Sequence, residues 1–229
     1  MEMINRTGRM WGKTKQVARK LAKVVTSAVL VSGLMLAAPK PAQANSIEFM
    51  AGHKSAVVDI KASAKITDEL GLFFRVRPSM DYTGTISSFG LADLSIKLTD
   101  GLDAVGEIQL IGGTPIPRAG LQHFIKAGDF SAYNLATIGL DSKPYLELLT
   151  ALSYSPALSE TIELLTKIEN VSDLDASGHI WSTQRVRVGI SLDGFGFGAA
   201  VDLTETGNHA NSSDDTFGWN LGGFVSKTF

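Results

Sequence analysis

Residues 54–66 read KSAVVDIKASAKI, and their side chains alternate in polarity along the whole stretch. Every even position from Ala56 to Ile66 is apolar, whereas the odd positions from Asp59 to Lys65 hold Asp, Lys, Ser and Lys. Successive side chains of a β-strand point to opposite faces. A period of two therefore predicts a strand with one apolar and one polar face.

The same alternation returns in several other segments of the chain. It is clear in residues 71–80, 89–99 and 194–204, and it is blurred in residues 119–127 and 130–140. Glycines and polar residues separate these segments, as they do in proteins made only of strands. The sequence therefore predicts an all-β fold of antiparallel strands.

Twelve segments have strand character. They are residues 46–52, 54–66, 71–80, 89–99, 103–112, 119–127, 130–140, 144–154, 159–169, 181–192, 194–204 and 217–229. Two alternatives stay open at this point. A single strand over 46–66 gives eleven strands, and the Leu, Glu and Lys content of 158–174 also allows a helix.

The first 44 residues have the composition of a secretory leader. A basic region with seven Lys and Arg up to Lys23 precedes an uncharged apolar run from Val24 to Ala38, and Ala42-Gln43-Ala44 resembles a cleavage site. The apolar run is shorter than the roughly 20 residues of a spanning helix. We expect a signal peptide over 1–44 and a mature domain over 45–229.

The composition of the expected mature chain excludes several classes of function. The leader holds eight of the 21 Lys and Arg but one of the 23 Asp and Glu, which leaves 13 bases and 22 acids. A net charge of −9 argues against nucleic acid as a partner. The chain has no cysteine, which excludes disulfides, thiol nucleophiles and thiolate metal sites.

The connections between the expected strands alternate in length. Those at 67–70, 100–102, 128–129, 155–158 and 193 are short, whereas those at 81–88, 113–118, 170–180 and 205–216 are longer and polar. Outer-membrane barrels have short periplasmic turns and longer external loops. No segment after the leader has the length of a spanning helix, so membrane insertion requires a closed barrel.

The last strand reads FGWNLGGFVSKTF from Phe217 to Phe229. With apolar residues at alternate positions and a terminal Phe, it resembles the assembly signal of bacterial outer-membrane β-barrels, although Lys227 replaces a usual apolar residue. The resemblance implies an up-and-down transmembrane β-barrel of about twelve strands in the outer membrane of a Gram-negative bacterium. It also implies that the assembly machinery recognises Phe229, and it reaches no specific family.

In such a barrel the polar face of each strand points into the lumen. The predicted lumen residues are Asp59, Arg75, Arg77, Asp93, Glu107, Arg185, Arg187 and Asp202. The four arginines fall on strands that lie nearly opposite each other, so they predict a constriction that selects anions. The alternative is that Asp59 and Asp202 neutralise them in ion pairs that fill the lumen.

The chain shows no convincing catalytic or metal-binding pattern. His179 and Ser182 lie three residues apart, which places them on opposite faces of a strand unless a bulge intervenes. Four scattered His residues lack metal-ligand spacing. We therefore expect no catalytic residues, no metal and no cofactor.

The leading functional hypothesis is a porin-like channel for small hydrophilic solutes, with the lipid bilayer and the assembly machinery as partners. A non-conducting structural or adhesive barrel is the alternative, and a membrane-embedded lipid hydrolase is the third.

Export is expected to remove the leader, because its basic, apolar and small-residue regions follow in the order that signal peptidase requires. Mass spectrometry of the membrane-bound protein should find Asn45 as the first residue. An intact Met1 in that fraction would contradict the signal-peptide prediction.

Overall fold

The computed structural model describes residues 45–141, 144–207 and 216–229. The expected leader, residues 1–44, lies outside the described residues. Twelve strands follow one another along the chain: β1 (Ser46–Gly52), β2 (Ser55–Lys65), β3 (Leu70–Asp81), β4 (Ile86–Thr99), β5 (Leu102–Ile111), β6 (Thr114–Ala127), β7 (Phe130–Gly139), β8 (Leu146–Tyr154), β9 (Ile162–Asp175), β10 (Gly178–Leu192), β11 (Phe195–Thr206) and β12 (Thr216–Thr228).

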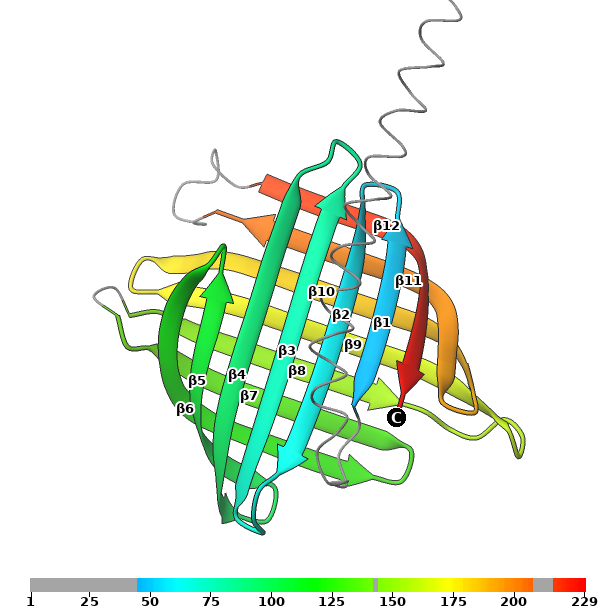
Figure 1. Ribbon diagram of the computed structural model, residues 1–229, viewed down its shortest axis with the longest axis horizontal. Helices are drawn as coiled ribbons and strands as arrows, with labels where there is room; N and C mark the ends of the chain where they lie inside the picture. Colours follow the sequence, from blue (N-terminus) through cyan, green and yellow to red (C-terminus); the bar gives the residue numbers. More distant parts are fainter. Residues whose placement is uncertain (1–44, 142–143, 208–215) are drawn as a thin grey trace, which may run out of the picture.

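These strands form one closed antiparallel barrel. Each strand pairs with its neighbours in sequence, and β1 closes the ring by pairing with β12, from Ser46 opposite Thr228 to Gly52 opposite Gly222. In Figure 1 the strands of the near wall, β1 to β5, cross those of the far wall, β7 to β10, at a steep angle. The predicted all-β, up-and-down barrel of twelve strands is confirmed.

Both open alternatives are settled by the strand pairing. The first segment forms two strands, because His53 and Lys54 make the turn between β1 and β2. The segment with helical composition is strand β9, which pairs with β8 and β10 along its length. Within the described residues, no helix is long and apolar enough to cross a membrane.

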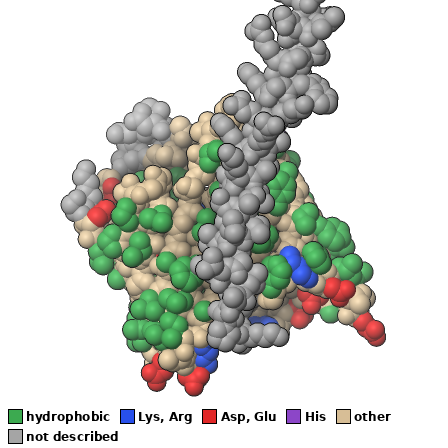
Figure 2. All heavy atoms as spheres, in the orientation of Figure 1, with side chains coloured by type: hydrophobic (Ala, Val, Ile, Leu, Met, Phe, Trp, Pro, Cys, Tyr) green, Lys and Arg blue, Asp and Glu red, His purple; other side chains and the backbone are tan. Residues whose placement is uncertain are grey.

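The outer face of the barrel is apolar over most of its surface. Exposed side chains such as Leu94, Ile96, Phe195 and Phe197 alternate with inward-facing polar or small residues on the same strands. Figure 2 shows hydrophobic side chains spread over the visible face, with acidic and basic ones gathered toward its edges. Such a surface is far larger than the apolar patches of water-soluble monomers.

Three of the four connections expected to be long are tight turns. The strands continue through 81–88, 113–118 and 170–180, leaving turns at 82–85, 112–113 and 176–177. Most of the fourth expected loop, 205–216, lies outside the described residues. The turn at Gly112-Gly113 has positive φ at both residues, as a two-residue hairpin turn requires. The polar residues that suggested loops therefore belong to the ends of strands.

Two prolines lie at the start of β6, within residues 113–118, which were expected to form a loop. Pro115 and Pro117 lie in β6 opposite Leu110 and Ile108 of β5. The carbonyl of Pro117 accepts a hydrogen bond from the amide of Leu140. The ring nitrogen of Pro117 therefore faces the same side, toward β7. The ladder between β6 and β7 begins only at Arg118. A proline costs no ladder bond at such an unpaired edge.

Both ends of the described chain meet at one end of the barrel. The amide of Phe229 donates to the carbonyl of Asn45 at 2.9 Å. Lys227 turns along the surface so that its ammonium group donates to the carbonyl of Asp193 at 2.7 Å and lies over the ring of Phe195. The charged end of Lys227 therefore lies at the rim, where the turn residue Asp193 accepts its hydrogen bond.

Charged side chains also pair within the turns at this end. Lys65 contacts Asp68 at 2.6 Å, and Lys97 contacts Asp100 at 2.5 Å. The hydrogen bond from each lysine lowers the pKa of the exposed carboxyl. The rim is thus charged while the wall above it is apolar, which is the distribution of a barrel that crosses a bilayer.

Val201→Arg is expected to destabilise the inserted barrel by about 2–4 kcal/mol, because Val201 faces outward near the middle of β11 and an arginine there meets hydrocarbon. Val201→Leu is the matched control and should change little. Urea unfolding in phospholipid vesicles measures both, and equal stabilities would contradict the assignment of the outer face.

Candidate functional site

Strand register places all eight predicted lumen residues on the inner face of the barrel. They are Asp59, Arg75, Arg77, Asp93, Glu107, Arg185, Arg187 and Asp202. Their side chains are buried or half-buried. They fall into two groups, one built around Arg75 and one built around Asp93 and Glu107.

The first group forms what we call the central ion network, and Arg75 of β3 lies at its centre. Its Nε and Nη2 donate to the two carboxylate oxygens of Asp59 at 2.8 and 2.5 Å. Its Nη1 and Nη2 also donate to Glu169 of β9 at 3.1 and 2.9 Å. Two bidentate contacts therefore hold one buried guanidinium between two strands.

The contact between Arg75 and Glu169 crosses the whole bore. Strands β3 and β9 lie six positions apart whichever way the ring of twelve is followed, so they are diametrically opposed. Lys61 of β2 reaches the same carboxylate at 3.2 Å, and Arg185 of β10 also pairs with it. Glu169 thus collects three cations from both walls and joins them in the middle of the lumen.

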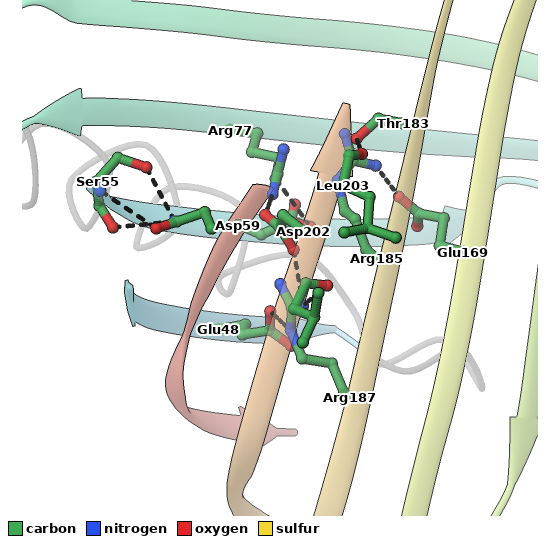
Figure 3. Close-up of polar contacts among 12 residues, drawn as sticks. Glu48, Ser55, Asp59, Arg77, Glu169, Thr183, Arg185, Arg187, Asp202 and Leu203 are labelled. Atoms are coloured by element: carbon green, nitrogen blue, oxygen red, sulfur yellow. Dashed lines mark hydrogen bonds and ion pairs between the residues drawn. The ribbon is translucent and has the colours of Figure 1, made fainter. Parts of the chain in front are cut away.

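A second bridge joins the remaining arginines. Arg77 of β3 donates to Asp202 of β11 at 2.6 Å, and Arg187 of β10 donates to the other oxygen of Asp202 at 2.8 Å. Arg187 also donates to Glu48 of β1 at 2.7 Å. Figure 3 shows these arginines converging on the carboxylates from different strands. All four predicted arginines are therefore engaged in ion pairs.

An apolar cluster fills the barrel beside the network. Met50, Val57, Leu165, Ala200 and Phe224 come from five strands, point inward and are each less than a tenth exposed. Gly196 and Gly198 face inward and alternate along β11 with the outward-facing Phe195 and Phe197. A Cβ at Gly196 would meet side-chain atoms of Ser226 and Leu165, so this part of the lumen is packed like a protein core.

The second group is acid-rich and is built around Asp93, Glu107, Glu147 and Asp173. Asp93 lies opposite Glu107 on β4 and β5, and Glu147 lies opposite Asp173 on β8 and β9. Gln109 links the two pairs by donating to Glu147 at 2.9 Å. Asp93, Glu107, Gln109 and Glu147 are buried, and Asp173 is half-buried.

Arg118 is the positively charged side chain next to these acids. Its Nε lies 3.6 Å from Glu107, donates to Thr137 at 2.8 Å, and the guanidinium packs over the ring of Tyr145. Both carboxylate oxygens of Glu107 and one of Asp93 find no hydrogen-bond donor among the described residues. In the described part of the chain, no three His, Asp or Glu residues are arranged to hold a metal ion.

Several members of these clusters were not singled out from the sequence. Glu48, Glu169, Arg118 and Glu147 are as central as the predicted residues. Alternation already places Glu169 on the polar face of its segment. The sequence does not show which strand lies opposite Glu169, because only closure of the barrel determines that.

The histidine and serine considered for catalysis do share a face, because a bulge lies between His179 and Trp181. His179 and Ser182 both have outward register, yet the Nδ1 of His179 lies 3.2 Å from the carbonyl of Gly207. Register alone therefore assigns neither side chain a catalytic role.

Comparison with known proteins finds no matching family model and no curated relative. Among solved structures, the chain is similar to the KdgM porin, with 12% identity, 82% of this chain and 99% of that chain covered, and a TM-score of 0.47. It is similar to the NanC porin at 7% identity, 81% and 98% coverage and a TM-score of 0.47. It is also similar to LpxR from Salmonella typhimurium at 10% identity, with 82% of this chain and 100% of that chain covered and a TM-score of 0.43.

These neighbours are outer-membrane β-barrels. The barrel architecture of this chain rests on its own strand pairing. No single family is identified.

Glu169→Gln is expected to destabilise the barrel by about 3–5 kcal/mol, because it leaves the inward-facing Arg75 and Arg185 and the partly exposed Lys61 without their shared partner. The control is Glu163→Gln on the same strand, where the side chain is exposed and the expected change is within about 0.5 kcal/mol. Adding Arg185→Gln to Glu169→Gln should restore part of the loss. Urea unfolding in vesicles measures all three variants, and equal stability of the two single variants would contradict the network.

Proposed function

We propose that this chain spans the outer membrane of a Gram-negative bacterium as a barrel whose lumen is closed, and that its role is structural or adhesive. The observation that carries the proposal is the pair of contacts from Arg75 to Glu169 across the full bore. The end that carries Asn45 and Phe229 then faces the periplasm.

The outer face supports the membrane assignment. Large apolar side chains are exposed on strands all around the ring, and the charged turn residues lie at the end of the wall. In water this surface would drive aggregation, whereas hydrocarbon solvates it. Closure by β1 and β12 pairs the strand edges that a bilayer cannot hydrogen-bond.

The interior supports a closed lumen. A porin keeps a polar, water-filled channel, and a 12-strand barrel has room for one only if its side chains stay along the walls. Here the central ion network crosses between opposite strands, and the apolar cluster of Met50, Val57, Leu165, Ala200 and Phe224 occupies space beside it. The alternative weighed from the sequence, in which ion pairs fill the lumen, agrees best with this arrangement.

A porin-like channel for small hydrophilic solutes is the competing function. Its anion-selective constriction requires the arginines to present free charge to the bore, and each of the four is instead paired with an acid. Passage through such a lumen therefore requires that the bridges break first.

Conductance of the refolded protein in planar bilayers tests the proposal. The wild type should show no stable channel at moderate voltage. A variant that combines Arg75→Ala and Glu169→Ala removes both ends of the bridge without changing the net charge, and it should admit ions. A steady open channel in the wild type would contradict closure, and anion preference in that channel would support the porin-like alternative.

A further inference from the structure

The outer wall of β6 to β10 carries a line of polar side chains where lipid is expected. His123, Asn134, Thr150, Asn170 and Gln184 lie directly opposite one another, strand by strand, across these five strands. We call this line the polar row. Four inter-strand steps of about 4.8 Å make it about 19 Å long.

Register shows that the polar row faces outward. On the same strands, the residues two positions away include Leu121, Leu148 and Ile168, which are exposed apolar side chains of the outer face. The inward positions between them hold lumen residues such as Glu169 and Arg185. The polar row therefore belongs to the wall that the proposed function places in contact with the bilayer.

From Asn134 to Gln184 the polar row runs through the middle of the strands, whereas His123 lies beside the β4–β5 turn, opposite Leu102. Thr150 is the central residue of β8, and Asn134 and Gln184 lie near the centres of β7 and β10. One neighbouring row is wholly apolar and consists of Ile125, Ala132, Leu152, Ile168 and Val186. Interfacial lipid headgroups lie at the rims of a barrel, so they do not reach this depth.

Contacts within the chain satisfy few of these polar groups. Thr150 donates to Asn134 at 3.1 Å, and Asn170 donates to Ser172 at 3.2 Å. In the part of the chain that the structure describes, the side chains of His123 and Gln184 make no hydrogen bond. Each carboxamide offers two donors and an acceptor, and hydrocarbon supplies no partner for the remainder.

The opposite wall has no such feature. At the middle of β3, the outward side chains are Phe74 and Val76, and they lie beside Ala92 and Gly90 of β4. A barrel that met only lipid would have the same apolar surface on both sides. The difference between the two walls points to a partner that covers β6 to β10, of which β7 to β10 form the far wall in Figure 1.

We propose that the polar row is the interface of a homodimer, with a second copy of this chain as the occupant. Asn134, Thr150, Asn170 and Gln184 are uncharged and can both donate and accept, so the surface is complementary to itself. A charged partner would bury a charge that nothing here compensates. Small polar side chains that hydrogen-bond across an interface are also what joins proteins within a membrane.

The symmetry of a membrane dimer fits the middle of the polar row. Two copies with the same orientation are related by a two-fold axis along the membrane normal. Such an axis at Thr150 brings Asn134, Thr150 and Asn170 of both copies around one point. The hydrogen-bonding groups that the chain leaves open then face equivalent groups of the other copy.

Cysteine cross-linking tests the dimer directly, because the chain has no native cysteine. In proteoliposomes or native membranes, Thr150→Cys should give a disulfide-linked dimer on mild oxidation. Val76→Cys is the matched control, since it is exposed at the middle of β3 on the opposite wall. Equal cross-linking at both positions, or a product of Thr150→Cys with a different protein alone, would overturn the proposal.

A second variant removes the interface without touching the lumen. Asn134→Leu combined with Asn170→Leu should lower the dimer fraction by about tenfold and leave the barrel folded. The heat-dependent shift of the folded barrel on a gel reports folding separately. A folded variant that dimerises as the wild type does, or loss of the folded barrel, would contradict the interface. Failure of the wild type itself to insert would instead count against the membrane barrel on which this inference rests.

Discussion

Internal pairing of every backbone amide in the wall is the constraint on which this structure depends. A bilayer offers no water to an unpaired strand, so the sheet has to close on itself. Closure joins β12 to β1, which has only seven residues. Where β1 ends, the side chain of Asn220 continues the seam by accepting from the amide of Lys54 at 2.9 Å and donating to the carbonyl of Ser55 at 3.2 Å.

Gly52 makes this seam possible. A Cβ at this position would clash with the carboxamide of Asn220. The absence of a side chain therefore lets a buried asparagine replace the ladder that the short first strand cannot extend.

Closure also decides what the lumen charges do. Once the ring is sealed, polar side chains of opposite walls share one narrow interior, and charges there are expensive unless they are paired. The central ion network meets this condition by linking Arg75 to two carboxylates and by joining Arg77 and Arg187 through Asp202. The charged lumen residues that suggested a pore in the sequence therefore pair with one another and fill the lumen.

The sequence predicted the parts of this fold that local patterns encode. Each of the twelve predicted segments overlaps one of the twelve strands, and residue parity placed Arg75 and Asp202 inside. Strand ends were predicted less well, because the proline pair of β6 and the polar tip of β9 resemble loops. The partners across the bore could not be predicted, since Arg75 and Glu169 lie 94 residues apart and meet only through the size of the closed ring.

The blurred alternation of β6 and β7 has a physical explanation. His123 and Asn134 occupy outward positions, whereas the outward residues at the middle of β3 are Phe74 and Val76. The departure from the pattern was visible in the sequence, but its alignment with Thr150, Asn170 and Gln184 required the strand register. A weak local signal in each strand therefore becomes a coherent surface only when the strands are placed side by side.

Swelling of proteoliposomes in isotonic sugar solutions tests the closed lumen most directly, because neutral sugars report passage through the bore without any influence of charge. If the lumen is closed, vesicles containing the wild-type barrel should swell no faster in a small sugar than protein-free vesicles do. Rapid swelling with a rate that falls as the sugar becomes larger would contradict closure, since it would show a water-filled passage where the structure has Arg75 bound to Glu169.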